Sequence, residues 1–127
     1  MKNRYFFSAS TLLLITILSL VPAREFPQVD ARFADKWAHW VMYAAATLVI
    51  GIEQGLRKPV RRWHIRIMRI AVFTSLWGAL MEVCQATLTT TRSGDAMDAA
   101  ANTFGAACGA TLLFFLYRQF PRLRDTP

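Results

Sequence analysis

The sequence predicts an all-α protein, a four-helix transmembrane bundle whose N- and C-termini both lie in the cytoplasm. Hydrophobic residues make up 54% of the 127 residues, a share above that of ordinary soluble domains. They fall into four runs, each about as long as a helix that crosses a bilayer, roughly 17 to 25 residues. A soluble helical domain is the competing interpretation, but a protein this small would not usually bury four such segments. We therefore expect a single membrane domain, residues 1–127.

The first predicted span covers about residues 5–22. No charged residue interrupts it, and Lys2 and Arg4 precede it. The same pattern, ending in Val21-Pro22-Ala23, also describes a secretory signal peptide with a small residue at the cleavage point. We expect the segment to be retained, because the chain that follows is itself membrane-embedded in this interpretation. Cleavage would instead leave three spans and an external N-terminus.

The second and third predicted spans cover about residues 35–53 and 67–86. Trp37 and Trp40 lie near the start of the second span, at the depth where indole rings prefer to sit. A basic loop, residues 54–66, joins the two spans, and Pro59 interrupts it. We expect this loop on the cytoplasmic side.

The fourth predicted span covers about residues 96–117, and residues 118–127 form a tail that we expect to be poorly ordered. Gly105 and Gly109 are four residues apart and match the small-xxx-small pattern that lets two helices approach closely in lipid. They are therefore predicted to be helix-packing residues. Cys84 and Cys108 would lie at depths several helical turns apart, so we expect two free thiols and no disulfide.

The distribution of positive charge predicts the orientation and excludes nucleic acid as a partner. The net charge is +7, and 11 of the 15 Lys and Arg residues fall within residues 2–4, 57–69 and 118–124. Positive segments that alternate with mixed ones are typical of the positive-inside arrangement. No basic face interleaved with aromatic residues, as in a nucleic-acid binder, is left over. The predicted partner is the lipid bilayer, whose anionic headgroups would meet the basic loop.

Polar residues in apolar surroundings form the predicted site. An ionised group at membrane depth costs roughly 2.5 to 3.5 kcal/mol, so such groups persist where they pair or face water. Asp35, Lys36 and His39 are three and four residues apart and share one side of a helix. Because the second and fourth spans run inward and the third outward, the polar ends of all three meet at the external surface. The candidate binding residues are Asp35, Lys36, His39, Tyr43, Glu82, Gln85, Arg92, Asp95, Asp98 and Asn102.

Each of these residues also has a purely structural interpretation. Asp95 can cap the fourth helix, with Asp98 favoured by the helix dipole in its first turn. Asn102 can hydrogen-bond to a neighbouring helix, and Lys36 can extend to the headgroups. The whole set can be an inert polar clamp that fixes the register of the helices. For Glu82, the deepest of the set, the expected partners are Arg92, Lys36 or His39.

Three motifs at these positions resemble the VanZ-like family of small bacterial membrane proteins. They are Asp35-Lys36-x-x-His39-x-x-x-Tyr43, Glu82-x-x-Gln85 and Arg92-x-x-Asp95-x-x-Asp98-x-x-x-Asn102-x-x-Gly105. The resemblance covers roughly Asp35 to Gly109 and implies a helical bundle in the bacterial cytoplasmic (inner) membrane. It also implies a link to the cell envelope, since the family is named for a member connected with low-level teicoplanin resistance. It implies no particular reaction.

Three functions are open at this stage. In the first, the external pocket binds an envelope lipid, a glycopeptide-related ligand or a membrane partner, and Arg92, Lys36 and His39 contact its phosphate or carboxylate. Such a protein would act in cell-envelope maintenance or antibiotic tolerance. In the second, an enzyme acts on a lipid-linked envelope precursor, with His39 or Glu82 as general base and Arg92 as anion stabiliser.

The third function is an accessory subunit, in which the glycine face of the fourth span docks on another membrane protein. A divalent metal would need ligands such as Asp35, His39, Glu82 and Asp98. Their spacing is not a recognised metal signature. We therefore predict no metal and no cofactor.

Overall fold

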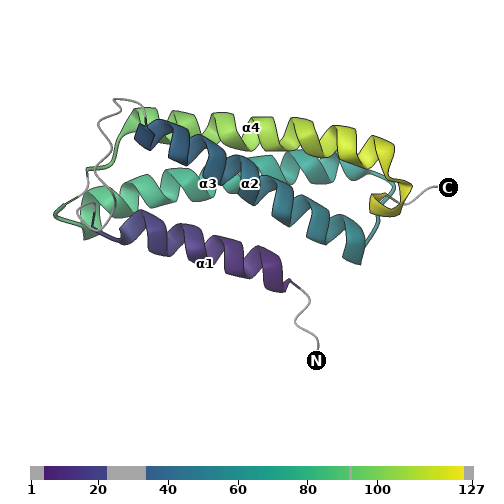
Figure 1. The fold of residues 1–127 in the computed structure, drawn as a ribbon, viewed down its shortest axis with the longest axis horizontal. Coiled ribbons are helices and arrows are strands. Elements are labelled where there is room, and N and C mark those ends of the chain that lie inside the picture. The colour runs from purple at the N-terminus through teal and green to yellow at the C-terminus, as the bar shows by residue number, and fades with distance from the viewer. Residues whose placement is uncertain (1–4, 23–33, 92, 125–127) are drawn as a thin grey trace.

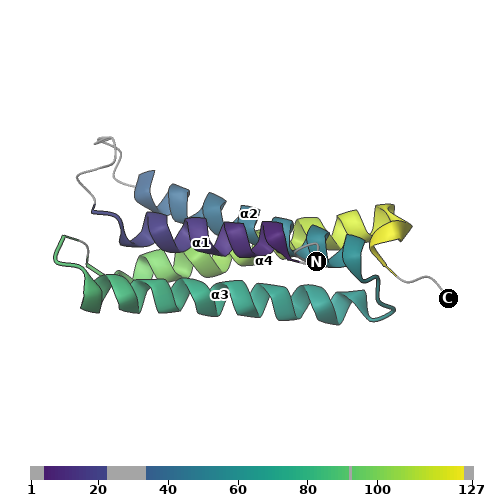
Figure 2. The same ribbon diagram turned by 90° about the horizontal axis from the view of Figure 1, so that it is seen from below.

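The fold was obtained as a computed structural model, which describes residues 5–22, 34–91 and 93–124 (Figure 1). These residues contain helices and no strand, so the predicted all-α class is confirmed for this part of the chain. The elements are α1 (Phe6–Leu20), α2 (Ala34–Arg57), α3 (Trp63–Leu88), α4 (Ala96–Gln119) and a final 3-10 turn, η2 (Pro121–Leu123). The four long helices lie side by side as a bundle in both views (Figures 1 and 2).

The closest helix pair is α2 and α4, and glycine makes their approach possible. A Cβ atom at Gly105 would collide with the backbone carbonyl of Trp40, and one at Gly109 would lie 2.6 Å from the carbonyl oxygen of Ala44. Both glycines lie on the face of α4 that contacts α2, because they are four residues apart. Small residues at such a contact let two helix backbones touch. This contact fixes the depth of α4 relative to α2.

A cluster of buried hydrophobic residues lies at the end of the bundle where α2 stops and α3 begins. Leu113 and Tyr117 are fully buried there, and the Tyr117 hydroxyl donates a 2.7 Å hydrogen bond to the carbonyl oxygen of Gly51. Leu123 of η2 packs against the same cluster and is also buried. The sequence predicts a poorly ordered tail from residue 118 onward, but α4 continues to Gln119 and η2 packs against the core. In the described part of that segment the chain folds back because Leu123 has an apolar surface to cover.

The basic loop is shorter than predicted. Helix α2 continues to Arg57 and α3 begins at Trp63, so only residues 58–62 connect them instead of residues 54–66. Trp63 stacks on Tyr117, with ring centroids 5.8 Å apart. This packing stabilises the first turn of α3, which charge alone would not predict.

Helix α1 is attached to the other helices at both of its ends. The carboxylate of Glu53 accepts hydrogen bonds from the backbone N–H of Ser8 at 2.7 Å and of Phe7 at 3.2 Å. These N–H groups belong to the first turn of α1, where no partner exists within the helix itself. At the far end, the Gln85 side chain donates a 2.8 Å hydrogen bond to the carbonyl oxygen of Ser19. Glu53 therefore caps α1 from a neighbouring helix.

Two of the four helices are long and apolar enough to cross a membrane by length and composition. These are α3 and α4, each with a mean hydropathy of 1.5 over its most apolar stretch. Helix α1 is apolar but has 15 residues, and α2 carries polar residues at both of its ends. The sequence predicts four spans, and two of the described helices, α3 and α4, meet this criterion of length and hydropathy.

Candidate functional site

The candidate site lies at the end of the bundle where α2 and α4 begin and α3 ends (Figure 1). Side chains from all three helices meet there, and we refer to them as the polar cluster. Its members are Asp35, Lys36, His39, Glu82, Asp95, Asp98 and Asn102. All seven were named from the sequence. Arg92, which was also predicted for this site, lies outside the described residues.

The aspartates at the start of α4 are joined by one lysine. The side chain of Asp95 accepts a 2.9 Å hydrogen bond from the N–H of Met97, which caps the helix. Lys36 Nζ donates to Asp95 Oδ2 at 3.0 Å and to Asp98 Oδ1 at 2.9 Å. The N–H of Met97 and the Lys36 ammonium hold the pKa of Asp95 below its ordinary value. Lys36 therefore bridges two carboxylates of the protein and is not free for an incoming anion.

His39 lies at the centre of the cluster, between acidic groups on both sides of its ring. Its Nδ1 atom is 2.9 Å from Asn102 Oδ1 and 3.6 Å from Glu82 Oε1. With an amide oxygen as its partner, Nδ1 is the donor. Nε2 lies 3.8 Å from Asp35 Oδ1 and 3.9 Å from Asp98 Oδ2. The ring is thus oriented by Asn102 and presents its other nitrogen to two carboxylates.

Asn102 is fully buried between α2 and α3, and Gly78 makes room for it. A Cβ atom at Gly78 would lie 2.8 Å from Cβ of Asn102 and 2.9 Å from its amide nitrogen. Any larger residue at position 78 would push the amide away from His39. Gly78 was not predicted as part of the site, although a lone glycine within an apolar helix indicates that another group approaches closely.

Glu82 approaches one of its three predicted partners and also bonds to the backbone near the start of α4. Its Oε2 atom accepts a 3.1 Å hydrogen bond from the backbone N–H of Asp95, so it joins α3 to the turn that precedes α4. Within the described residues, the basic nitrogen that lies within 4.0 Å of the Glu82 carboxylate is His39 Nδ1, 3.6 Å from Oε1, and Lys36 is occupied by the aspartates. Of the three partners predicted for Glu82, the structure therefore favours His39 over Lys36.

Two predicted residues lie outside this network. Gln85 points to α1, where it bonds to Ser19, because it is nearly one helical turn beyond Glu82. Tyr43 lies one turn deeper than His39, buried against Ile15 and Ala46. Its hydroxyl has no hydrogen-bond partner in the described part of the protein. Gln85 thus contributes to helix packing, and Tyr43 forms the apolar floor beneath the cluster.

The cluster contains more acid than base. Four carboxylates face one ammonium group and one imidazole across the described side chains. In addition, Glu82 Oε1 and Asn102 Nδ2 are buried and have no hydrogen-bond partner among those residues. Asp35, His39 and Asp98 each place one ligand atom within 4.8 Å of the other two. This arrangement attracts positive charge and hydrogen-bond donors more than anions.

An open aromatic cleft of about 430 Å³ adjoins the cluster between α2 and α4. Trp37, Trp40 and Phe104 line it together with Ala101, and Lys36 forms its wall on the side of the cluster. Trp40 stacks on Phe104 with ring centroids 6.1 Å apart, and both Trp37 and Phe104 are more than half exposed. From the sequence the tryptophans were expected to be interfacial anchors. Phe104, about two turns along α4, was not predicted as part of any site.

The cysteine prediction is confirmed, since Cys84 and Cys108 are both free thiols. Cys108 Sγ accepts a 3.4 Å hydrogen bond from the Trp40 indole, so it supports one wall of the aromatic cleft. No protein-family model, curated protein or solved structure matches this chain.

Proposed function

We propose that the chain is a multi-pass protein of the bacterial cytoplasmic membrane, of the VanZ-like type, in which all four helices cross the bilayer. The exposed apolar surface supports this proposal. In the most apolar stretches of α3 and α4 only 33% and 28% of the residues are buried inside the protein. Large side chains on three helices face outward and are more than half exposed, including Phe7, Leu13, Leu76, Phe104 and Phe115. A soluble monomer rarely exposes so much contiguous apolar surface.

The distribution of charge supports an orientation with both termini in the cytoplasm. The basic residues Arg57 to Arg69 and Arg118 to Arg124 belong to the end of the bundle where α1 begins and α4 ends (Figure 1). The polar cluster, in which acids predominate, belongs to the opposite end. By the positive-inside rule the basic end is cytoplasmic, and the cluster then faces the outside.

We further propose that the polar cluster and the aromatic cleft together bind an envelope lipid. The observation that carries this proposal is their shared wall: Lys36 joins the carboxylates on one side and lines the aromatic cleft on the other. Aromatic rings at the rim of a bundle bind an acyl or isoprenoid chain, and can also hold an ammonium group. The surplus carboxylates accept hydrogen bonds from hydroxyl or amine groups. The ligand is therefore a lipid whose headgroup carries such donors, and the protein acts in maintenance of the cell envelope or in antibiotic tolerance.

Native mass spectrometry of the purified protein tests this proposal. Membrane lipids with amine, sugar and choline headgroups are added at equal chain length, and the bound fraction is measured. Phe104→Ala should reduce binding of the amine or sugar lipid several-fold, whereas Phe115→Ala, an equally exposed aromatic on α4 outside the cleft, should not. Asp35→Asn should reduce the preference for those headgroups over choline. Equal binding by both phenylalanine variants would refute the site.

An enzyme acting on the same lipid is the second candidate. The orientation of His39 favours it, because the contact with Asn102 holds Nδ1 and leaves Nε2 as the nitrogen that would act as a general base. The two candidates differ in the effect of His39→Gln. A binding protein loses affinity, whereas an enzyme retains the bound lipid and loses its conversion, which mass spectrometry of extracted lipids detects.

A further inference from the structure

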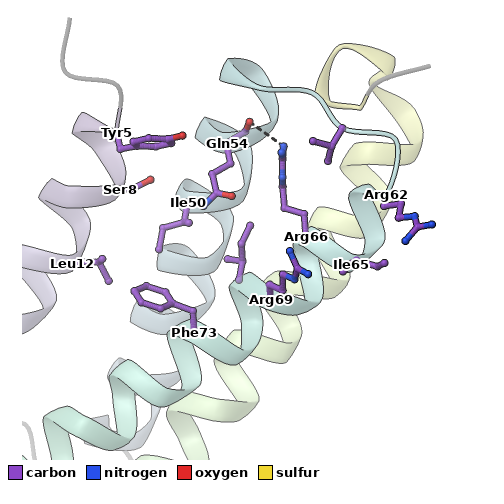
Figure 3. A pocket seen from close by; sticks show the side chains of 12 residues that line it. Tyr5, Ser8, Leu12, Ile50, Gln54, Arg62, Ile65, Arg66, Arg69 and Phe73 are labelled. Carbon is purple, nitrogen blue, oxygen red and sulfur yellow. Dashed lines mark hydrogen bonds between the residues drawn. The ribbon is translucent and has the colours of Figure 1, made fainter. Parts of the chain in front are cut away.

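A second cavity, of about 630 Å³, lies near the opposite end of the bundle between α1, α2 and α3 (Figure 3). It is partly open to the outside and plays no part in the site described above. Its lining divides into two kinds of side chain. Arginines of α3 and the residue before it, Arg62, Arg66 and Arg69, lie towards the end of the bundle. Apolar side chains, among them Leu12, Ile70 and Phe73, lie further along the helices.

The three arginines form a cationic wall without an acidic counterpart. Arg66 and Arg69 are three residues apart on α3 and share one face of it, and Arg62 directly precedes the helix, so three like charges lie close together in the chain. None of the described residues that line the cavity is acidic, and neither Arg62 nor Arg69 has a carboxylate within ion-pair distance in the described part of the chain. Glu53, the acid that precedes Gln54 of the cavity lining, is occupied by the first turn of α1 and by Arg57. An anion in the cavity would therefore relieve the repulsion.

One of the arginines is held in place by the protein backbone. Arg66 Nη1 donates to the carbonyl oxygen of Lys58 at 2.5 Å. It also donates to the carbonyl oxygen of Gln54 at 3.2 Å, the bond that is drawn in Figure 3. The Tyr117 hydroxyl also interacts with this guanidinium group. A guanidinium group held in this way loses little side-chain entropy when one of its remaining N–H groups binds phosphate. The cationic wall is thus partly organised before a ligand arrives.

The apolar part of the cavity has the dimensions of the upper part of a lipid chain. Arg66 and Phe73 are seven residues apart on α3, which corresponds to about 10 Å along the helix axis. Tyr5 and Leu12 are separated by the same distance along α1, and both line the cavity (Figure 3). Helix α1 is attached to α2 through Ser8 and to α3 through Gln85, so it forms a fixed second wall. A soluble anion would use the arginines but leave this apolar wall uncovered.

We propose that this cavity binds one anionic phospholipid, with its phosphate at the arginines and its chains against Leu12 and Phe73. The inference uses the proposed membrane location and does not depend on the ligand proposed for the polar cluster. In the proposed orientation the arginines lie at the cytoplasmic surface. A phospholipid bound there fills the space between α1 and α3 and stabilises the attachment of α1.

The test is a titration of the purified full chain in a neutral detergent with phosphatidylglycerol, followed by native mass spectrometry. Phosphatidylcholine with the same chains is the neutral comparison. Each arginine near the surface contributes about fivefold in affinity. Arg69→Gln should therefore bind phosphatidylglycerol about fivefold more weakly, and the combined Arg62→Gln and Arg69→Gln variant about 30-fold more weakly. Arg61→Gln, an exposed neighbour that does not line the cavity, is the matched control and should bind as the wild type does.

A second variant tests the apolar wall without changing the charge. Leu12→Trp narrows the cavity, so it should weaken phosphatidylglycerol binding while circular dichroism shows an unchanged helix content. Glycerol phosphate, which carries the headgroup alone, should bind far more weakly than the lipid. The proposal is overturned by equal affinity for the two lipids, by an equal loss in Arg61→Gln, or by glycerol phosphate binding as tightly as the lipid. A lipid at the aromatic cleft would be counted separately, because its binding does not respond to Arg62 or Arg69.

Discussion

Glu53 offers the sharpest test of how α1 is attached to the rest of the protein. The residue is 6% exposed, and its side chain accepts hydrogen bonds from the Ser8 N–H at 2.7 Å, the Ser8 hydroxyl at 2.5 Å and the Phe7 N–H at 3.2 Å. Its only charged partner among the described residues is Arg57, 3.3 Å away and partly exposed. The carboxylate therefore acts mainly as a cap for α1.

The structure gives different magnitudes for three substitutions. Glu53→Ala leaves the buried N–H and hydroxyl of Ser8 without a partner and should cost about 3 kcal/mol of unfolding free energy. Glu53→Gln keeps one acceptor oxygen but loses the charge, and should cost about 1–2 kcal/mol. Arg57→Gln removes only the ion pair at the surface and should cost less than about 1 kcal/mol. The order of the three values distinguishes capping from ion pairing.

The assay is reversible unfolding in mixed detergent micelles, followed by circular dichroism. A double-mutant cycle between Glu53→Gln and Ser8→Ala should give a coupling energy of about 1 kcal/mol, since the two side chains contact each other. If Arg57→Gln costs as much as Glu53→Ala, or if the cycle gives no coupling, the capping role of Glu53 is wrong.

Three further predictions concern the contact between α2 and α4 and the polar cluster. Gly105→Val places methyl groups against the α2 backbone and should cost about 3 kcal/mol, whereas Ala107→Val on the exposed face of α4 should be nearly neutral; thermal unfolding measures both. Lys36→Met leaves the buried Asp98 without its ammonium partner and should cost about 2 kcal/mol of unfolding free energy in the same assay. A smaller loss would show that water replaces the ammonium group as the partner of Asp98. Asp95 has a lowered pKa, so its contribution to stability is complete above its ordinary value of about 4 and is lost as the pH falls through the lower folded value. Below about pH 4 the melting temperature should therefore fall less steeply in Asp95→Asn than in the wild type, and equal slopes would contradict this role.

The helices and their order follow from the sequence because each contains a long apolar run. The limits of the helices do not follow in the same way. Trp63 belongs to a basic segment, so the sequence suggests a loop, but its ring packs on Tyr117 and extends α3. Leu123 is isolated in a polar tail, yet the 3-10 turn after Pro121 brings it back to the core. Tertiary contacts set these boundaries, and a single sequence does not contain them.

The members of the polar cluster follow from helical spacing, whereas their partners depend on rotation of each helix. Gln85 is near Glu82 in sequence, but the rotation of α3 turns it towards Ser19. Glu53 was overlooked because it falls at the end of a predicted span, where charge is common. A carboxylate next to an apolar run still requires a partner, and this requirement is the signal that indicates its role. Phe104 carries no such signal, since aromatic residues occur throughout membrane helices. The lone glycine at position 78 indicates a close approach but not which group approaches.

The central claim is that the polar cluster faces the outside and the arginine cavity the cytoplasm. Single cysteines at Thr90→Cys, beside the cluster, and at Arg61→Cys, beside the cavity, test it most directly in a background in which Cys84 and Cys108 are serine. Intact cells are treated with a maleimide that does not cross the membrane. We predict labelling at position 90 in intact cells and at position 61 only after the membrane is opened. Labelling of position 61 in intact cells, or of neither position before the membrane is opened, would contradict the account.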